Sequence, residues 1–184
     1  MEEINLLRNL YGLKKVYRMN SVENRKESSA EHSWSCLVLA DYFLEKIKKI
    51  DKLKVFELLI YHDVIEIEVG DSPLMPGKDY SDKKRKEEKS VEILKNKLPH
   101  EVREKYIALF REFEEEKTRE AKFAKAIDQL DAVIHEMDYK KDWNGWTEEF
   151  IRKSKSKYFE EFPELKDLFD KLMIYLKKEE YFEQ

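Results

Sequence analysis

Apolar residues recur three and four positions apart along most of the chain, the spacing of one helix face. A first stripe includes Ile4, Leu7 and Leu10, and a polar loop is expected at residues 20–29. Gly70 is placed to stop a helix, because glycine is common just past helix ends. The pattern predicts helices at about 2–15, 29–50, 51–69, 81–97, 100–116 and 119–140, with one or two closing helices in 141–184.

Strand-like alternation of apolar and polar residues is nowhere long enough to build a sheet. The chain has only 4 Gly and 4 Pro, which leaves few turns and favours long helices. No segment has the composition of a linker, and no internal repeat is present. We therefore expect an all-α fold in a single domain over residues 1–184.

The charge balance narrows the classes of partner. Charged residues make up 41% of the chain, but 36 basic and 40 acidic residues leave a net charge of −4. This balance lacks the basic footprint of a nucleic-acid binder, so no nucleic-acid partner is expected. No apolar run approaches the ~18 residues of a membrane span, and the acidic start lacks a signal-peptide pattern. We expect a cytoplasmic protein without membrane association.

The first candidate functional residues are His62 and Asp63, which are adjacent in an otherwise apolar helical segment. An imidazole and a carboxylate are costly there unless they are paired or bound to a metal ion. Glu66 follows four residues after His62, so the three side chains are expected on one side of the helix. Asp71 lies just past the expected end of this helix, where the chain can fold back toward that face.

Two further groups are ambiguous when each is taken alone. Asp128 lies in an apolar stretch, where it either caps or pairs with a neighbouring lysine, or belongs to a buried site. Glu31 and His32 fit equally well as ordinary first-turn residues of a helix capped by Ser28 or Ser29.

Taken in order, His32, His62–Asp63 and Asp128 resemble the H…HD…D signature of the HD-domain metal phosphohydrolases. The chain also resembles the 5′-deoxynucleotidase branch of that superfamily, over roughly residues 5–140. The matching stretches are Leu13-Lys14-Lys15-Val16-x-Arg18, Ser29-x-Glu31-His32 and His62-Asp63-x-x-Glu66-x-x-x-Gly70-Asp71-x-Pro73. The resemblance implies an HD-type helical bundle with closing helices at about 141–184.

The resemblance implies that one divalent metal ion is held by His32, His62, Asp63 and Asp128. Two imidazoles and two carboxylates form a mixed nitrogen and oxygen donor set that suits Mn²⁺, Co²⁺, Ni²⁺, Fe²⁺ or Zn²⁺, with Mg²⁺ also possible. A purely structural metal is less expected, because closed structural sites are usually rich in cysteine.

The implied reaction is hydrolysis of the 5′-phosphate of a deoxynucleoside monophosphate. Glu66 and Asp71 match the catalytic carboxylates of the family. Glu66 either activates the attacking water or protonates the leaving 5′-oxygen, and the sequence leaves this choice open. Arg18 matches the phosphate-binding arginine, with a surface ion pair as the alternative.

One position departs from the family pattern. Close relatives carry a tryptophan beside the sugar just after the arginine, but this chain has Met19 there. Met19 is flexible and would adapt to an added hydroxyl group. We expect hydrolysis of both deoxyribose and ribose monophosphates, with a weaker deoxy preference than in tryptophan-bearing relatives.

Several alternatives stay open at this point. The chain could be a nucleoside triphosphate hydrolase or phosphodiesterase of the same superfamily, or a non-enzymatic helical binding module. The family commonly forms dimers, and the many aromatic residues fit a homodimer interface. His100 and His135 have no assigned role, and the lone Cys36 is expected to be an inert buried thiol.

Overall fold

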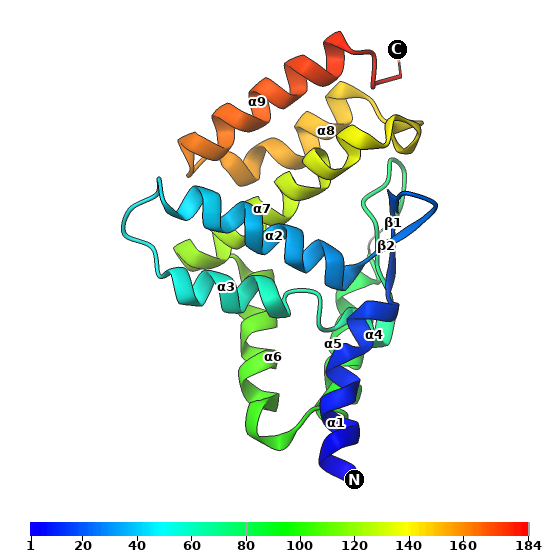
Figure 1. The fold of residues 1–184 in the computed structure, drawn as a ribbon, viewed down its shortest axis with the longest axis vertical. Helices are drawn as coiled ribbons and strands as arrows, with labels where there is room; N and C mark the ends of the chain where they lie inside the picture. Colours follow the sequence, from blue (N-terminus) through cyan, green and yellow to red (C-terminus); the bar gives the residue numbers. More distant parts are fainter. Residues whose placement is uncertain (80, 184) are drawn as a thin grey trace.

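Helices dominate the computed structural model, which describes residues 1–79 and 81–183 (Figure 1). This confirms the expected helical class. The α-helices are Glu2–Leu10 (α1), Ser29–Leu44 (α2), Lys52–Tyr61 (α3), Glu66–Val69 (α4), Lys83–Lys95 (α5), His100–Glu115 (α6), Arg119–His135 (α7), Glu148–Lys155 (α8) and Pro163–Lys178 (α9). Short 3₁₀ turns lie at Tyr11–Lys15, Glu136–Asp138, Lys140–Trp143 and Ser156–Phe159.

The predicted polar loop at 20–29 is wrong, because the chain forms an antiparallel hairpin from Tyr17–Val22 (β1) and Arg25–Ser28 (β2). Side chains two residues apart share one face of a strand, and here the inward face carries polar groups. Asn20 and Glu27 are buried, and Arg18 pairs with Glu27. The hairpin therefore lacks the apolar alternation by which strands are detected in a sequence.

The start of α2 follows the expected capping chemistry. Ser28 is the N-cap, and Ser28 and Glu31 form a reciprocal capping box. The helix ends at Leu44 rather than near residue 50, and the connecting turn contains Lys49 at a positive φ of 58°. The side chain of Asp51 then caps α3 by accepting from the Lys54 backbone amide.

The predicted helix at 51–69 is interrupted after Tyr61. The backbone amides of Val64, Glu66 and Glu68 bond to the carbonyl three residues earlier, so the chain tightens between α3 and α4. His62 and Asp63 lie in this tight turn. Gly70 ends α4 with a φ of 73°, as its position in the sequence predicts.

Two other helices are shorter than predicted, because each continues into 3₁₀ turns. The first helix ends at Leu10 and a turn runs to Lys15, where Gly12 allows close packing. A Cβ on Gly12 would lie 2.9 Å from Cγ2 of Ile67 in α4. The helix predicted at 119–140 ends at His135.

The buried apolar residues form two clusters. The larger cluster joins α2, α3, α7, α8 and α9 with one side of α6, and the smaller one joins α5 and the other residues of α6 to the turn after α3. Figure 1 shows α8 and α9 at one end of the molecule and α1, α5 and α6 toward the other. Leu59 belongs to the larger cluster and Val64 to the smaller, so His62 and Asp63 lie where the clusters meet.

Within the described residues, none of the helices combines the length and the apolar character needed to cross a membrane.

Candidate functional site

The imidazole of His62 is oriented by its own helix. Its Nδ1 lies 2.8 Å from the backbone carbonyl of Leu59, which fixes the proton on Nδ1 and leaves the Nε2 lone pair free. His62 is 3% exposed, and its Nε2 has no hydrogen-bond partner among the described residues. A buried, oriented nitrogen without a hydrogen bond, whose neighbour at 3.1 Å is a carboxylate oxygen of Asp63, has the properties of a metal ligand.

Asp63, beside His62, has a second buried atom without a hydrogen bond. Its Oδ1 lies 3.1 Å from His62 Nε2, and its Oδ2 has no hydrogen-bond partner among the described residues. Arg18 Nη1 is 3.7 Å from Oδ2. Burial opposes ionisation of Asp63, but its contact with His62 and the nearby His32 and Arg18 lower its pKa to about 2. Asp63 is therefore an anion at neutral pH.

His32 on α2 lies between two carboxylates of α7. Its Nδ1 is 2.8 Å from Asp131 Oδ2, and its Nε2 is 3.1 Å from Asp128 Oδ1. Burial and the charge of Arg18 lower the pKa of His32, yet the Cys36 thiol and the two carboxylates outweigh them and raise it well above its usual value. Metal binding would displace the Nε2 proton, while Asp131 would hold the ring from the other side.

The chemistry of these donors suits a divalent ion, and donor atoms of His32, Cys36 and His62 lie within 4.8 Å of one another. His62 Nε2 and Asp63 Oδ2 are buried without partners, and Asp128 faces the second imidazole. The two imidazole rings lie 5.4 Å apart between centroids. Cys36 also lies close, with Sγ 3.6 Å from His32 Nε2, but burial raises the pKa of its thiol to about 12. Because a thiolate is the binding form, Cys36 is a poor ligand, as its sequence context predicts.

Glu66 and Asp71 add two carboxylates to this region. Glu66 Oε2 accepts a hydrogen bond of 2.7 Å from Ser29 Oγ. Burial and the nearby charge of Asp63 raise the pKa of Glu66 to about 8. Burial also raises the pKa of Asp71, against the opposing charge of Arg18. Both groups therefore hold protons more tightly than ordinary carboxylates, which suits proton transfer.

Arg18 is held by residues that sequence analysis missed. Its Nε lies 3.1 Å from Oε2 of Glu27, which is buried on the neighbouring strand. Glu27 Oε1 lies 3.6 Å from His135 Nδ1, and His135 Nε2 bonds the Ser21 carbonyl at 2.8 Å. His135 thus supports the hairpin. Glu27 sits in a stretch expected to be a loop, so the sequence offers no burial signal for it.

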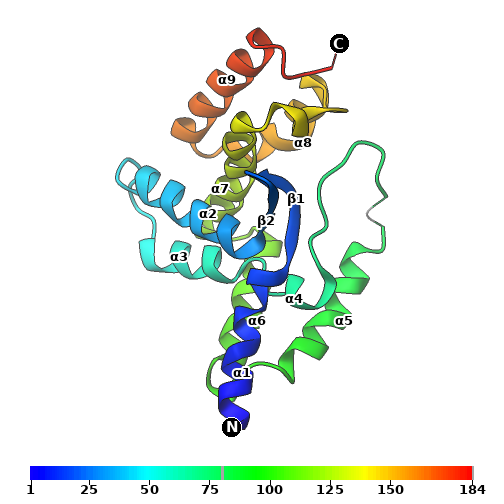
Figure 2. The same ribbon diagram turned by 45° about the vertical axis from the view of Figure 1, so that its right-hand side comes forward.

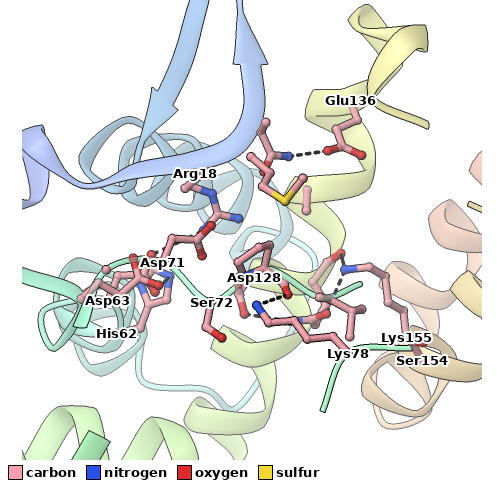
Figure 3. A pocket seen from close by; sticks show the side chains of 18 of the residues that line it. Arg18, His62, Asp63, Asp71, Ser72, Lys78, Asp128, Glu136, Ser154 and Lys155 are labelled. Carbon is pink, nitrogen blue, oxygen red and sulfur yellow. Dashed lines mark hydrogen bonds and ion pairs between the residues drawn. The ribbon is translucent and has the colours of Figure 1, made fainter. Parts of the chain in front are cut away.

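A cavity of about 790 Å³ joins these groups to a second region (Figure 3). Its near end contains Arg18, His62, Asp63, Glu66, Asp71 and Asp128. Its lining also includes Glu136, Trp146, Ile151, Ser154, Lys155 and Tyr158, which we call the distal end, and Figure 3 shows Glu136 and Lys155 on the side away from His62 and Asp63. Met19 lines the cavity and is 48% exposed, whereas His32 is fully buried.

The hairpin and the loop after α4 also contribute side chains to the lining of this cavity. Met19, Asn20 and Lys26 come from the hairpin, and residues 70–74 and 78–79 come from the loop. Figure 2 shows the two segments running alongside each other. His100 is exposed at the start of α6 and does not line the cavity. The structure thus brings seven of the predicted site residues to one cavity: Arg18, Met19, His62, Asp63, Glu66, Asp71 and Asp128. The eighth, His32, is buried beside Asp128.

Comparison with known proteins places this arrangement in a family. The sequence model of the HD domain matches residues 11–166, which is most of the chain. This chain belongs to the HD domain family. The matched range includes both the near end and the distal end of the cavity.

Relatives of known name share the HD domain. Human "5'-deoxynucleotidase HDDC2" is 29% identical over 139 residues, which cover 74% of this chain and 67% of the human protein. The Xenopus laevis protein of the same name is 30% identical over 115 residues, covering 62% of this chain and 56% of the relative. The chain thus spans between 56% and 67% of the length of these two relatives.

Solved HD-type structures are similar over nearly the whole chain. A "Predicted metal-dependent phosphohydrolase" from Magnetospirillum magnetotacticum MS-1 matches with a TM-score of 0.88 and 26% identity, covering 100% of this chain and 95% of that one. PH0347 protein from Pyrococcus horikoshii OT3 matches with a TM-score of 0.60 and 27% identity, covering 90% and 99%. The arrangement of helices around the cavity is therefore shared with other proteins.

Proposed function

We propose that this protein is a metal-dependent phosphohydrolase that removes the 5′-phosphate from nucleoside monophosphates. The observation that carries the proposal is the pair of buried, unpartnered atoms, His62 Nε2 and Asp63 Oδ2, beside Arg18 in an accessible cavity. The names of the human and Xenopus laevis relatives support the choice of substrate.

In this proposal the metal ligands are His32, His62, Asp63 and Asp128. When bound, a divalent ion would polarise the phosphoryl group and lower the pKa of water. The protein supplies the orientation, because Leu59 fixes the His62 ring and Asp131 fixes the His32 ring.

Arg18 and the two further carboxylates complete the proposed mechanism. Arg18 presents its guanidinium fork to the phosphate oxygens while Glu27 holds its other side. Glu66 exchanges a proton with the attacking water or the leaving 5′-oxygen, and Asp71 supports this transfer from the neighbouring loop. The raised pKa of Glu66, about 8, brings its proton affinity near neutral pH, where such transfers are efficient.

The sugar is proposed to lie against Met19, between the phosphate and the distal end of the cavity. Met19 lines the cavity on β1, directly after Arg18. A mobile thioether at this wall discriminates weakly against a 2′-hydroxyl group, so both deoxyribose and ribose monophosphates are proposed substrates.

A phosphate-release assay tests the proposed function. The chain would be stripped with a chelator, reloaded separately with Mn²⁺, Co²⁺, Ni²⁺, Fe²⁺, Zn²⁺ or Mg²⁺, and supplied with nucleoside monophosphates. We expect orthophosphate and nucleoside only when metal is present. Release of tripolyphosphate from triphosphates, or ring opening of cyclic nucleotides, without release from monophosphates would instead identify another hydrolase. No turnover with any metal would favour a binding module.

The homodimer and the cytoplasmic location stay predictions. Trp34, Val38 and Tyr42 recur every four residues on α2 and are 66%, 53% and 57% exposed. A second copy of this chain is the proposed partner for this stripe. Light scattering of the purified protein checks it, with a monomeric mass as the contradicting result.

A further inference from the structure

The proposed phosphate hydrolysis assigns no role to the residues at the distal end of the cavity. Figure 3 shows Glu136 and Lys155 away from His62 and Asp63, across the cavity. The cavity volume of about 790 Å³ lies in the range of sites that enclose a whole small ligand. A phosphate group held by Arg18 would leave this region for the rest of the substrate.

Lys155 is a buried cation with no close ion pair in the described part of the chain, and the charges of Asp128 and Glu136 offset only part of the effect of its burial. It is 7% exposed, and its Nζ donates to the backbone carbonyl of Gln129 at 3.2 Å and to Gln129 Oε1 at 2.9 Å. An ammonium group has three N–H donors, so one remains for a ligand. Burial lowers the pKa of Lys155 to about 8, in agreement with an incompletely satisfied charge.

Glu136 supplies an acceptor from another part of the cavity lining, above Lys155 in Figure 3. Its Oε1 accepts from Asn20 Nδ2 at 2.8 Å, and it forms no ion pair with Lys155 among the described residues. Burial and the charge of Asp142 raise the pKa of Glu136 to about 7. Buried Lys155 and partly buried Glu136 therefore line the same cavity without a direct contact between them in the described part of the chain.

Flat and apolar side chains line the same cavity as this donor and acceptor. Trp146 and Tyr158 are partly buried, and Ile151 is 3% exposed. An aromatic and apolar wall with one donor and one acceptor is complementary to a planar heterocycle with polar edges. A phosphate or a bare sugar has no such planar face.

We propose that the distal end is a nucleobase subsite. Lys155 donates a hydrogen bond to a carbonyl oxygen or ring nitrogen of the base, and Glu136 accepts one from its N–H groups. This inference rests on the proposed function, which supplies a nucleotide with its phosphate at the near end. It makes Lys155 and Glu136 specificity-determining residues.

Lys155 has a second conceivable role besides direct contact with the base, and the test must distinguish the two. Gln129 Nε2 donates to Asp128 Oδ2 at 3.0 Å, so Lys155 could act only by orienting Gln129 and, through it, Asp128. That role would affect every substrate equally. A direct contact with the base would affect only substrates that carry a base.

The test compares Lys155→Met with Lys153→Met, a matched change at an exposed position of the same helix. For Lys155→Met we expect kcat/KM for nucleoside monophosphates to fall about 10–100-fold, mostly through KM, as for loss of a charged hydrogen bond. Hydrolysis of 2-deoxyribose 5-phosphate should not change. An equal loss for both substrates would overturn the proposal, and Lys153→Met should resemble the unmodified protein.

A binding measurement separates this inference from the proposed function. Nucleosides should quench the fluorescence of Trp146, and Lys155→Met should raise their Kd about 10–100-fold. If no nucleotide is hydrolysed but this shift occurs, the subsite stands and the proposed function fails. If nucleotides are hydrolysed and the Kd is unchanged, the subsite is wrong. Should Lys155→Met fail to fold, Glu136→Gln replaces it, and an unchanged Kd in that variant overturns the proposal.

Discussion

The two ends of the cavity differ in the partners of their charged side chains. At the near end, the carboxylates of Asp63 and Asp128 are anionic and lie close to the cations Arg18 and Lys125. At the distal end, Lys155 has carbonyl partners, and Glu136 has an amide partner. The near end therefore concentrates charge on one point, whereas the distal end spreads a few polar groups over an apolar wall.

This difference separates two kinds of energetic contribution. Concentrated charge is suited to holding an ion and stabilising a phosphoryl transition state. Dispersed hydrogen bonds beside apolar surface are suited to binding the ground state and discriminating between ligands. Substitutions at the near end should therefore act on turnover, and substitutions at the distal end on affinity.

The largest effect is expected for His62→Ala. Removing the oriented Nε2 donor should abolish metal content and phosphate release, because no other described side chain replaces it. Elemental analysis and the phosphate assay measure these losses, and nucleoside binding at the distal end should persist. His100→Ala, at an exposed position, is the matched control. Full metal occupancy in His62→Ala would remove the ligand assignment.

Glu66→Gln should have the next largest effect. The change keeps the shape of the side chain and the bond to Ser29 but removes the exchangeable proton. Turnover should fall about 10²–10⁴-fold, or roughly 3–5 kcal/mol, with the metal retained. Single-turnover kinetics and elemental analysis on the same sample check both parts. Near-normal turnover would exclude Glu66 from the proton transfer.

Asp131→Asn should produce a moderate loss. Among the described residues, Asp131 contacts the proposed ligand set through His32 Nδ1, at 2.8 Å, so it is a positioning residue. Loss of such a partner typically costs about 10–100-fold in metal affinity, and excess metal should restore turnover. Metal titrations give the affinity. If turnover stays low at saturating metal, Asp131 does more than orient His32.

The smallest effect is expected for Met19→Trp. A rigid indole at the sugar wall should raise the ratio of kcat/KM for matched deoxy and ribo monophosphates, by less than about 10²-fold. Trp34→Met, at a position that does not line the cavity, should leave the ratio unchanged. A strict deoxy preference in the unmodified protein would show that a residue other than Met19 forms the wall.

The near end could be predicted because its residues form an ordered sequence pattern. His62 and Asp63 stand out as polar residues in an apolar helix, and Gly70 marks the end of that segment. The distal end left no such pattern, since Glu136 and Lys155 come from different segments and look like ordinary surface residues. Their burial depends on how α7 and α8 pack, which local spacing does not encode.

The hairpin escaped prediction for a related reason. Its inward residues are polar because they contact polar groups rather than an apolar core, Glu27 holding Arg18 and Asn20 bonding Glu136. Hydrophobic periodicity detects elements that bury apolar surface. Elements whose buried face serves a polar site give no such signal, although Ser28 and Glu31 still marked the start of α2 correctly.

The close approach of Gly12 to Ile67 acts as a spacer between two segments of the cavity wall. Gly12 precedes the strand that carries Arg18, and Ile67 directly follows Glu66. Any side chain at position 12 would have to displace the stiff, β-branched Ile67. A methyl group at position 12 would therefore press, from outside the cavity, on the turn of α4 that carries Glu66.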